Sequence, residues 1–374
     1  MTSTDIYYVP YPRKKWLRRF FRLIGKILLN ILARPIITDM HRLPLKGPAI
    51  LAGNHVAVLE IVMMAVYSPA IVEFLGAGDI PLDPNMAWLA NLYGYIPIQR
   101  GTLDRAGIKK ALSVLKQGGI IGVFPQGGIW ETSVSQVRVG AAFLSEKGEA
   151  PVTPIGFGGV KGALKQILRF KRPELVMNVG RTLELPGVLD GISPSREGLE
   201  AYSEKILASI IELIPEDERP AASKRLGGTF DVSIRLMQSD GSLQIVSENN
   251  IKFEQRSALG RFFHFPQLLD ALHRNLELKV QALQHLDGPL QPLDLINACQ
   301  EILDYLDVNP GFFTYRFGID VGLQLKSAFQ TLIDMVASQS GNLTSVEIVP
   351  LYGYIELKTG ERIIEHGAPI IQSM

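Results

Sequence analysis

Short apolar runs that alternate with segments of helical spacing constrain the fold of residues 40–220 more than any other feature. Three of these runs, at residues 49–53, 120–124 and 151–157, carry apolar or small side chains at nearly every position. A strand that is apolar on both faces belongs in a sheet covered on both sides, and parallel sheets have this character. The sequence therefore predicts an α/β fold with a central, mostly parallel sheet and flanking helices.

Periodicity and turn residues predict the other elements of this region. Further strands are expected at residues 94–100 and 175–179. Helices are expected from the end of the first strand to about residue 66, and at residues 88–92, 102–116, 141–146 and 193–215.

The pattern changes after Pro220. Residues 227–253 alternate around a turn at 239–242, which is typical of a β-hairpin, and a second hairpin is expected around residues 358–361. Helical periods are expected at residues 266–286, 292–306 and 323–338.

The length of 374 residues exceeds one typical domain core. We predict a basic amphipathic helical region at residues 1–39, the α/β domain at 40–220 and an accessory α+β domain at 221–374. The accessory domain carries no motif that assigns it a chemical role.

Composition excludes several classes of protein. A hydrophobic content of 47% with 20% charged residues is typical of a globular chain and excludes a disordered one. The net charge of +1 argues against a nucleic-acid partner bound through bulk electrostatics. Cys299 is the single cysteine, so internal disulfides and cysteine-rich metal sites are excluded, and with no secretory signal visible we expect a cytoplasmic protein.

Residues 13–35 predict an amphipathic helix. A polar stripe recurs at every fourth position, and the other side is rich in aromatic and aliphatic side chains. The stripe consists of Arg18, Arg22, Lys26, Asn30 and Arg34. The charges are too frequent for a membrane-spanning helix. Two interpretations stay open: the helix lies in a membrane interface, which would make the protein peripherally membrane-associated, or it packs on its own domain.

A histidine follows the first apolar strand at the start of the next helix. His55 could take a proton from an alcohol at neutral pH, and Glu60 could orient and stabilise its imidazolium. Residues five apart on a regular helix point about 140° apart, so the pair must straddle the helix start, with Asn54 expected as the cap. The alternative interpretation is an ordinary capped helix with a hydrogen-bonded histidine.

Four stretches occur in a characteristic order. They are Asn54-His55 with Glu60; Gly94-Tyr95-Ile96-Pro97-Ile98-Gln99-Arg100; Phe124-Pro125-Gln126-Gly127-Gly128-Ile129 followed by Arg138-Val139-Gly140-Ala141; and Val152-Thr153-Pro154-Ile155. Together they resemble the glycerolipid acyltransferase family, which includes the lysophosphatidate acyltransferases. The resemblance covers about residues 40–220 and is more specific than the histidine alone.

The resemblance implies a division of roles. His55 would be the general base and Glu60 its support. Arg100 would pair with a phosphate on the acceptor, with Arg138 as a weaker phosphate candidate. The substrate loop would consist of Pro125, Gln126, Gly127 and Gly128, and its glycine amides could stabilise an oxyanion.

Acyl-CoA or acyl-carrier protein would donate the acyl group to a lysophospholipid or glycerol-phosphate acceptor at a membrane surface. Neither a cofactor nor a metal is expected.

Two departures from the family pattern leave the acceptor open. The family has aspartate where this chain has Glu60, and Glu-Gly-Thr-Arg where it has residues 126–129, Gln-Gly-Gly-Ile. One alternative is an acyltransferase for an alcohol without phosphate. Another is a catalytically silent protein that binds lipid or acyl thioester and uses residues 221–374 for partner contacts.

Overall fold

The computed structural model describes residues 6–99, 104–125, 140–185, 194–219, 225–246, 250–284, 286, 288–356 and 359–366. They form two compact units. The first contains the described residues of 1–79 and 85–221, and the second those of 80–84 and 222–371. Residues 80–84 are the part of the predicted 40–220 domain that groups with the second unit.

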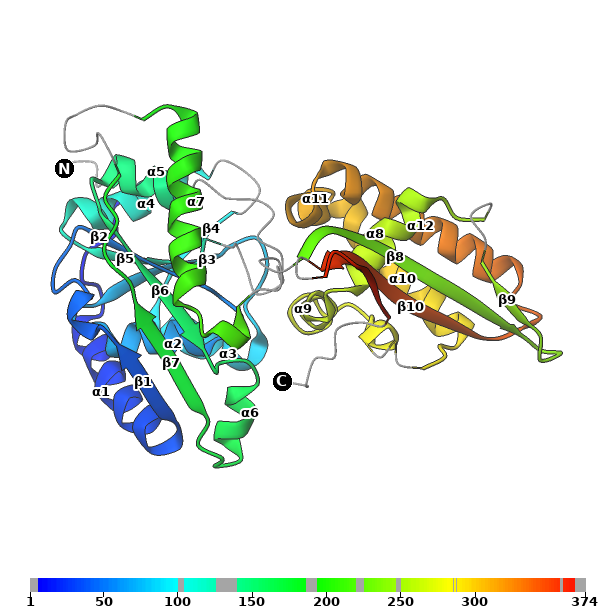
Figure 1. The fold of residues 1–374 in the computed structure, drawn as a ribbon, viewed down its shortest axis with the longest axis horizontal. Coiled ribbons are helices and arrows are strands. Elements are labelled where there is room, and N and C mark those ends of the chain that lie inside the picture. The colour runs from blue at the N-terminus through cyan, green and yellow to red at the C-terminus, as the bar shows by residue number, and fades with distance from the viewer. Residues whose placement is uncertain are drawn as a thin grey trace. The chain divides into compact units, whose positions relative to one another are not determined.

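A seven-stranded sheet forms the centre of the first unit (Figure 1). Its spatial order is β1-β7-β6-β2-β5-β3-β4, and every neighbouring pair is parallel except β6 with β7. The strands are β1 (Arg34–Thr38), β2 (Ala49–Gly53), β3 (Val72–Ala77), β4 (Ile96–Ile98), β5 (Ile120–Val123), β6 (Val152–Gly158) and β7 (Glu174–Val179). β2, β5 and β6 are buried at every residue. The predicted α/β fold with a mostly parallel sheet is confirmed.

Helices cover both faces of this sheet. One face carries α1 (Lys15–Leu32), α2 (Leu59–Tyr67) and α6 (Ala163–Leu168), which share one apolar core. The other carries α4 (Arg105–Lys116), α5 (Gly140–Gly148) and α7 (Arg196–Leu213) around a second core. α3 (Pro84–Tyr93) precedes β4, and short 3-10 turns lie at Met40–Arg42 and Glu216–Glu218. β2 therefore lies in the middle of a three-layer unit.

Two strands were absent from the prediction. The helix predicted at residues 13–35 ends at Leu32, because residues 34–38 pair with β7 as the edge strand β1. An edge strand tolerates Pro35, which cannot donate to a neighbouring strand. β3 was missed because Glu73 interrupts its apolar run, yet this carboxylate is fully buried.

The second unit contains an antiparallel sheet in the order β11-β10-β8-β9. Its strands are β8 (Arg225–Gln238), β9 (Leu243–Ile245), β10 (Leu343–Glu356) and β11 (Arg362–His366), so both predicted hairpins are confirmed. Its helices are α8 (Phe253–Phe263), α9 (Pro266–Leu276), α10 (Pro292–Val308), α11 (Gly311–Phe317) and α12 (Ile319–Ser338), with a 3-10 turn at Gln281–Gln284. α8 and α11 were not predicted. The helix expected to reach residue 286 ends at Leu276, because Glu277 adopts a left-handed conformation with φ 57°.

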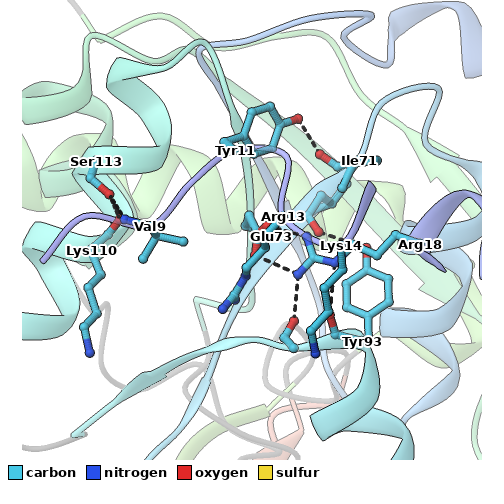
Figure 2. A network of polar contacts seen from close by, with 12 residues as sticks. Val9, Tyr11, Arg13, Lys14, Arg18, Ile71, Glu73, Tyr93, Lys110 and Ser113 are labelled. Atoms are coloured by element: carbon cyan, nitrogen blue, oxygen red, sulfur yellow. Dashed lines mark hydrogen bonds and ion pairs between the residues drawn. The ribbon is translucent and has the colours of Figure 1, made fainter. Parts of the chain in front are cut away.

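A buried ion pair fixes α1 to the first unit (Figure 2). Arg18 is 2% exposed and pairs through both terminal nitrogens with Glu73 at the start of β3. Arg13 Nε donates to the same carboxylate at 2.9 Å. Arg18 also donates to the backbone oxygens of Tyr93 and Gly94 at 3.0 Å each. Each charge is therefore compensated by hydrogen bonds, as burial requires.

The polar stripe of α1 accordingly faces inward at its first two positions. Arg18 is buried, and Arg22 donates to the backbone oxygens of Ser68 and Pro69. An apolar row on the opposite side of the helix is exposed to solvent. The large exposed side chains of α1 are Trp16, Phe20, Leu23, Ile24, Ile27, Leu28 and Ile31.

The helix thus packs on its own domain and also presents an apolar surface. Within the described part of the chain, no helix is both long and apolar enough to span a membrane.

Replacing Arg18 by alanine should lower the free energy of unfolding. Breaking a buried ion pair strands the remaining charge, and here the expected loss is about 3 kcal/mol, because Arg13 still compensates part of Glu73. Chemical denaturation would measure it. Arg19→Ala is the matched control, since Arg19 is the exposed neighbour on the same helix. Equal stability of the two variants would contradict the structural role of the pair.

Candidate active site

The carboxyl end of β2 is tied to β6 by one buried asparagine. Asn54 is 3% exposed; its Nδ2 donates to the backbone oxygen of Phe157 at 3.0 Å, and its Oδ1 accepts from the backbone N–H of Phe157 at 2.7 Å. The prediction that Asn54 caps the following helix is wrong. α2 is preceded by Val58, which makes no side-chain cap bond, because the amide of Asn54 is already committed to β6.

His55 lies in the loop between β2 and α2. Its ring stacks on Phe124 at the end of β5, with the ring centroids 4.5 Å apart and an angle of 29° between the planes. The histidine side chain is 18% exposed. β2 and β5 are parallel neighbours, so their carboxyl ends meet here, as is usual for ligand sites in open α/β sheets. Pro125 follows Phe124 directly and lies at this edge.

Glu60 reaches back from the first turn of α2 to this loop. Its Oε1 accepts from the backbone N–H groups of Val56 at 2.6 Å and Ala57 at 2.8 Å. Its Oε2 lies 4.0 Å from His55 Nδ1. The side chain is fully buried. The expectation that His55 and Glu60 straddle the helix start is therefore confirmed.

The protonation of Glu60 is sensitive to pH near neutrality. Burial raises the pKa of Glu60 to about 7, against the lowering effect of the backbone N–H groups of Val56 and Ala57. The ionised carboxylate is the form that stabilises a protonated imidazole. The charge of Glu60 therefore changes close to neutral pH.

The remaining predicted site residues, Arg100, Gln126, Gly127, Gly128 and Arg138, lie outside the described residues. The strand that leads to Arg100 can be placed. β4 is joined to β5 through β3 by parallel pairing, so it ends at the same edge of the sheet as β2. Gln99, just after β4, donates its backbone N–H to Asp104 Oδ2 at 2.9 Å.

Two features of the site were not predicted. The stacking of Phe124 on His55 is one of them, although an aromatic residue at a strand end beside a glycine-rich segment is a usable signal in the sequence. The N–H groups of Val56 and Ala57 were also missed, since backbone donors leave no mark in a sequence.

Comparison with known proteins agrees with this geometry. A family model described as Acyltransferase matches residues 34–158, the span from the start of β1 to the end of β6. The 1-acyl-sn-glycerol-3-phosphate acyltransferase of Bacillus subtilis (strain 168) is 23% identical over 189 residues, which is 50% of this chain and 92% of that protein. Residues 34–158 therefore carry an acyltransferase-family domain, and the chain resembles the glycerolipid acyltransferases.

The matched span includes the His55–Glu60 pair, so the first unit carries the O-acyltransferase domain. The second unit lies mostly beyond the matched residues. Among solved structures, the 1-acyl-sn-glycerophosphate acyltransferase from Thermotoga maritima is 18% identical with a TM-score of 0.39, covering 53% of this chain and 79% of that one.

Replacing Glu60 by glutamine should change how stability depends on pH. In the folded wild type, Glu60 keeps its proton up to about pH 7, whereas in the unfolded chain it releases the proton near pH 4.5. The free energy of unfolding of the wild type therefore falls as the pH rises between these values. The fall amounts to about 3 kcal/mol, and the glutamine variant should lack it.

Denaturation of both proteins at about pH 5 and about pH 8 measures this difference. Glu204→Gln on α7 serves as an exposed control. Parallel stability profiles for wild type and Glu60→Gln would show that the buried carboxylate is ionised throughout.

Proposed function

We propose that this protein transfers a fatty acyl group from acyl-CoA or acyl-carrier protein to a hydroxyl of a lysophospholipid or glycerol-phosphate acceptor, with His55 as general base. One observation carries the proposal. A fully buried carboxylate, Glu60, lies 4.0 Å from His55 Nδ1 inside the acyltransferase span. The name of the Bacillus subtilis relative supports a phosphorylated glycerol acceptor.

The chemistry follows from the two ring nitrogens of His55. Nδ1 faces Glu60, which leaves Nε2 as the nitrogen that takes the proton of the acceptor hydroxyl. The alkoxide attacks the thioester carbonyl, and the tetrahedral intermediate collapses with loss of the thiolate. The imidazolium then returns its proton to that thiolate, so the histidine is regenerated. The reaction requires neither a covalent enzyme intermediate nor a metal or cofactor.

Glu60 has a positioning and electrostatic role in this scheme. Its Oε1 fixes the loop through Val56 and Ala57, and its Oε2 stabilises the positive charge that develops on the ring. Stacking on Phe124 limits rotation of the imidazole. His55 therefore meets the acceptor in a restricted orientation, which lowers the entropic part of the barrier.

The substrate contacts of the proposal come from the sequence motifs. Arg100 and Arg138 would bind the acceptor phosphate through charge-assisted hydrogen bonds, and the amides of Gly127 and Gly128 would stabilise the oxyanion. Support comes from the topology, because β4 and β5 lead into these segments from the edge that carries His55.

The proposal places the protein in the cytoplasm, bound peripherally to a membrane. The outward face of α1 supports this, because its exposed row of aliphatic and aromatic side chains matches the interface of a bilayer. An acceptor with one acyl chain resides at such a surface. Docking there would bring the acyltransferase domain to its substrate.

A second candidate follows from residues 126–129. The family has glutamate and arginine where this chain has Gln126 and Ile129. Their loss favours an acceptor alcohol without phosphate. Turnover of purified protein with phosphorylated and unphosphorylated acceptors separates the two, and absence of turnover with both would favour a silent lipid-binding protein.

Removing the base should reduce turnover while leaving the fold intact. His55→Ala should lower kcat by about 10²- to 10⁴-fold, the usual contribution of a general base. Glu60→Gln should reduce kcat with little change in the KM of the thioester donor, and Glu60→Asp should be the milder change because it keeps the charge. Steady-state kinetics measures all three. Wild-type acyl transfer by His55→Ala would refute the assignment.

Replacing Arg100 should affect the acceptor alone. Arg100→Ala should raise the KM of a phosphorylated acceptor by about ten- to a hundredfold, as expected for loss of a charge-assisted pair. The KM of the donor should not change. A preference of the wild type for unphosphorylated alcohols, together with an unchanged acceptor KM in the variant, would support the second candidate.

A further inference from the structure

A basic and apolar segment follows β6 at residues 161–172. It contains five cationic side chains and no acidic one. The cations are Lys161, Lys165, Arg169, Lys171 and Arg172. Large apolar side chains project among them: Leu168 is 73% exposed and Phe170 is 78% exposed. The segment comprises α6 and the turn that leads into β7.

The segment belongs to the same layer as α1. Ala163 and Ile167 on the inner side of α6 pack into the core that also holds Leu29 and Ala33 at the end of α1. The turn after α6 touches α1 directly. Arg172 donates to the backbone oxygens of Asn30 in the last turn of α1 at 3.2 Å and of Ala33 just after the helix at 3.5 Å. The outer sides of α1 and α6 are therefore neighbouring parts of one face.

Phe170 follows the C-terminus of α6 in the left-handed conformation that commonly ends a helix: its N–H donates to the backbone oxygen of Ile167 and the N–H of Lys171 to that of Gln166, both at 2.9 Å. Its φ of 55° lies in the left-handed region, which a bulky side chain rarely adopts. Glycine usually occupies this position of a helix end, yet here it carries an aromatic ring that is mostly exposed. An exposed aromatic ring next to exposed cations points to a contact outside the chain.

The chemistry of the segment identifies that contact. Cations that surround exposed aliphatic and aromatic side chains match a bilayer surface with anionic headgroups: the apolar groups enter the interface and the cations meet the phosphates. Exposed cations also flank the apolar row of α1, at Lys15, Arg19 and Lys26. A zwitterionic surface would use the apolar groups alone.

We propose that residues 161–172 form a second membrane contact beside α1, which binds anionic lipid and makes docking depend on surface charge. The inference rests on the proposed membrane docking of α1. The two contacts have different roles. α1 supplies most of the apolar area, and the segment after β6 supplies the charge selectivity.

Vesicle flotation of the full-length protein tests the proposal, with phosphatidylcholine vesicles that contain or lack phosphatidylglycerol. Arg169→Gln combined with Lys171→Gln should weaken binding to the anionic vesicles by about tenfold or more and leave binding to phosphatidylcholine unchanged, because each cation near an anionic surface adds a favourable term. Added salt should weaken the wild type more than this variant. Arg172 is left intact because it contacts α1.

The matched control removes two cations from the other face of the sheet. Lys109 and Lys116 lie on α4, and the protein with both replaced by glutamine should bind both kinds of vesicle as the wild type does. If this control weakens anionic binding as much as the Arg169 and Lys171 variant, net charge alone explains the effect and the proposal is overturned.

Phe170→Asn separates docking from folding. Asparagine tolerates the left-handed conformation, so thermal unfolding should occur at the same or a higher temperature, while vesicle binding falls. Lower stability with unchanged vesicle binding would assign Phe170 to folding and overturn its docking role. Self-association of the wild type that Phe170→Asn abolishes, seen by sedimentation without lipid, would assign the face to a second copy of the chain and also overturn the proposal.

The test also separates this inference from the proposed catalysis. Flotation requires no turnover, so it remains informative with an inactive enzyme. Replacing both Phe20 and Leu23 on α1 by serine tests the membrane contact made by α1. Loss of flotation in that variant, with full anionic binding in the Arg169 and Lys171 variant, would keep the proposed docking and refute the second contact.

Discussion

The Glu60 carboxylate is the interaction on which the candidate site depends. One oxygen accepts two backbone N–H groups of the loop that carries His55, and the other faces the imidazole at 4.0 Å. Without the first contact the loop would lose its anchor, and without the second the ring would lose its counter-charge. Full burial of this carboxylate opposes its ionisation, so the ionised Glu60 that would support His55 also destabilises the fold. Active sites commonly combine function and local destabilisation in this way.

A similar balance determines the orientation of α1. Turning a cationic stripe inward is unfavourable unless its charges are compensated, and Glu73 together with the carbonyl oxygens at the end of α3 provides that compensation. Lys14 adds donors to the backbone oxygens of Asn91 and Leu92. Cations at this position also complement the dipole of α3. Since the polar side is used for packing, the apolar side remains outward, which is the reverse of an ordinary surface helix.

The sequence predicted the sheet and the proximity of His55 and Glu60 because both depend on local pattern. Buried parallel strands show as apolar runs, and the spacing of His55 and Glu60 required a helix start between them. Features that depend on distant partners could not be predicted. Asn54 looked like a cap but bonds Phe157 from another strand. Glu73 prevented the prediction of β3, because a buried carboxylate is not expected without a partner. Its ion-pair partners, Arg13 and Arg18, lie about 60 residues earlier in the chain. The inward turn of Arg18 was hidden for the same reason.

The layer next to the loop that carries His55 also presents the exposed apolar surface of α1. α1, α2 and α6 share one core, and the loop with His55 leads directly into α2. The side chains next to His55 are themselves apolar and partly open to solvent, with Val56 39% and Val58 37% exposed. A polar, water-soluble substrate would gain no binding free energy from these apolar side chains. An amphiphilic acceptor can keep its acyl chain on the apolar surface while its hydroxyl reaches His55. The arrangement of this layer is therefore the strongest physical argument that the acceptor is a lipid.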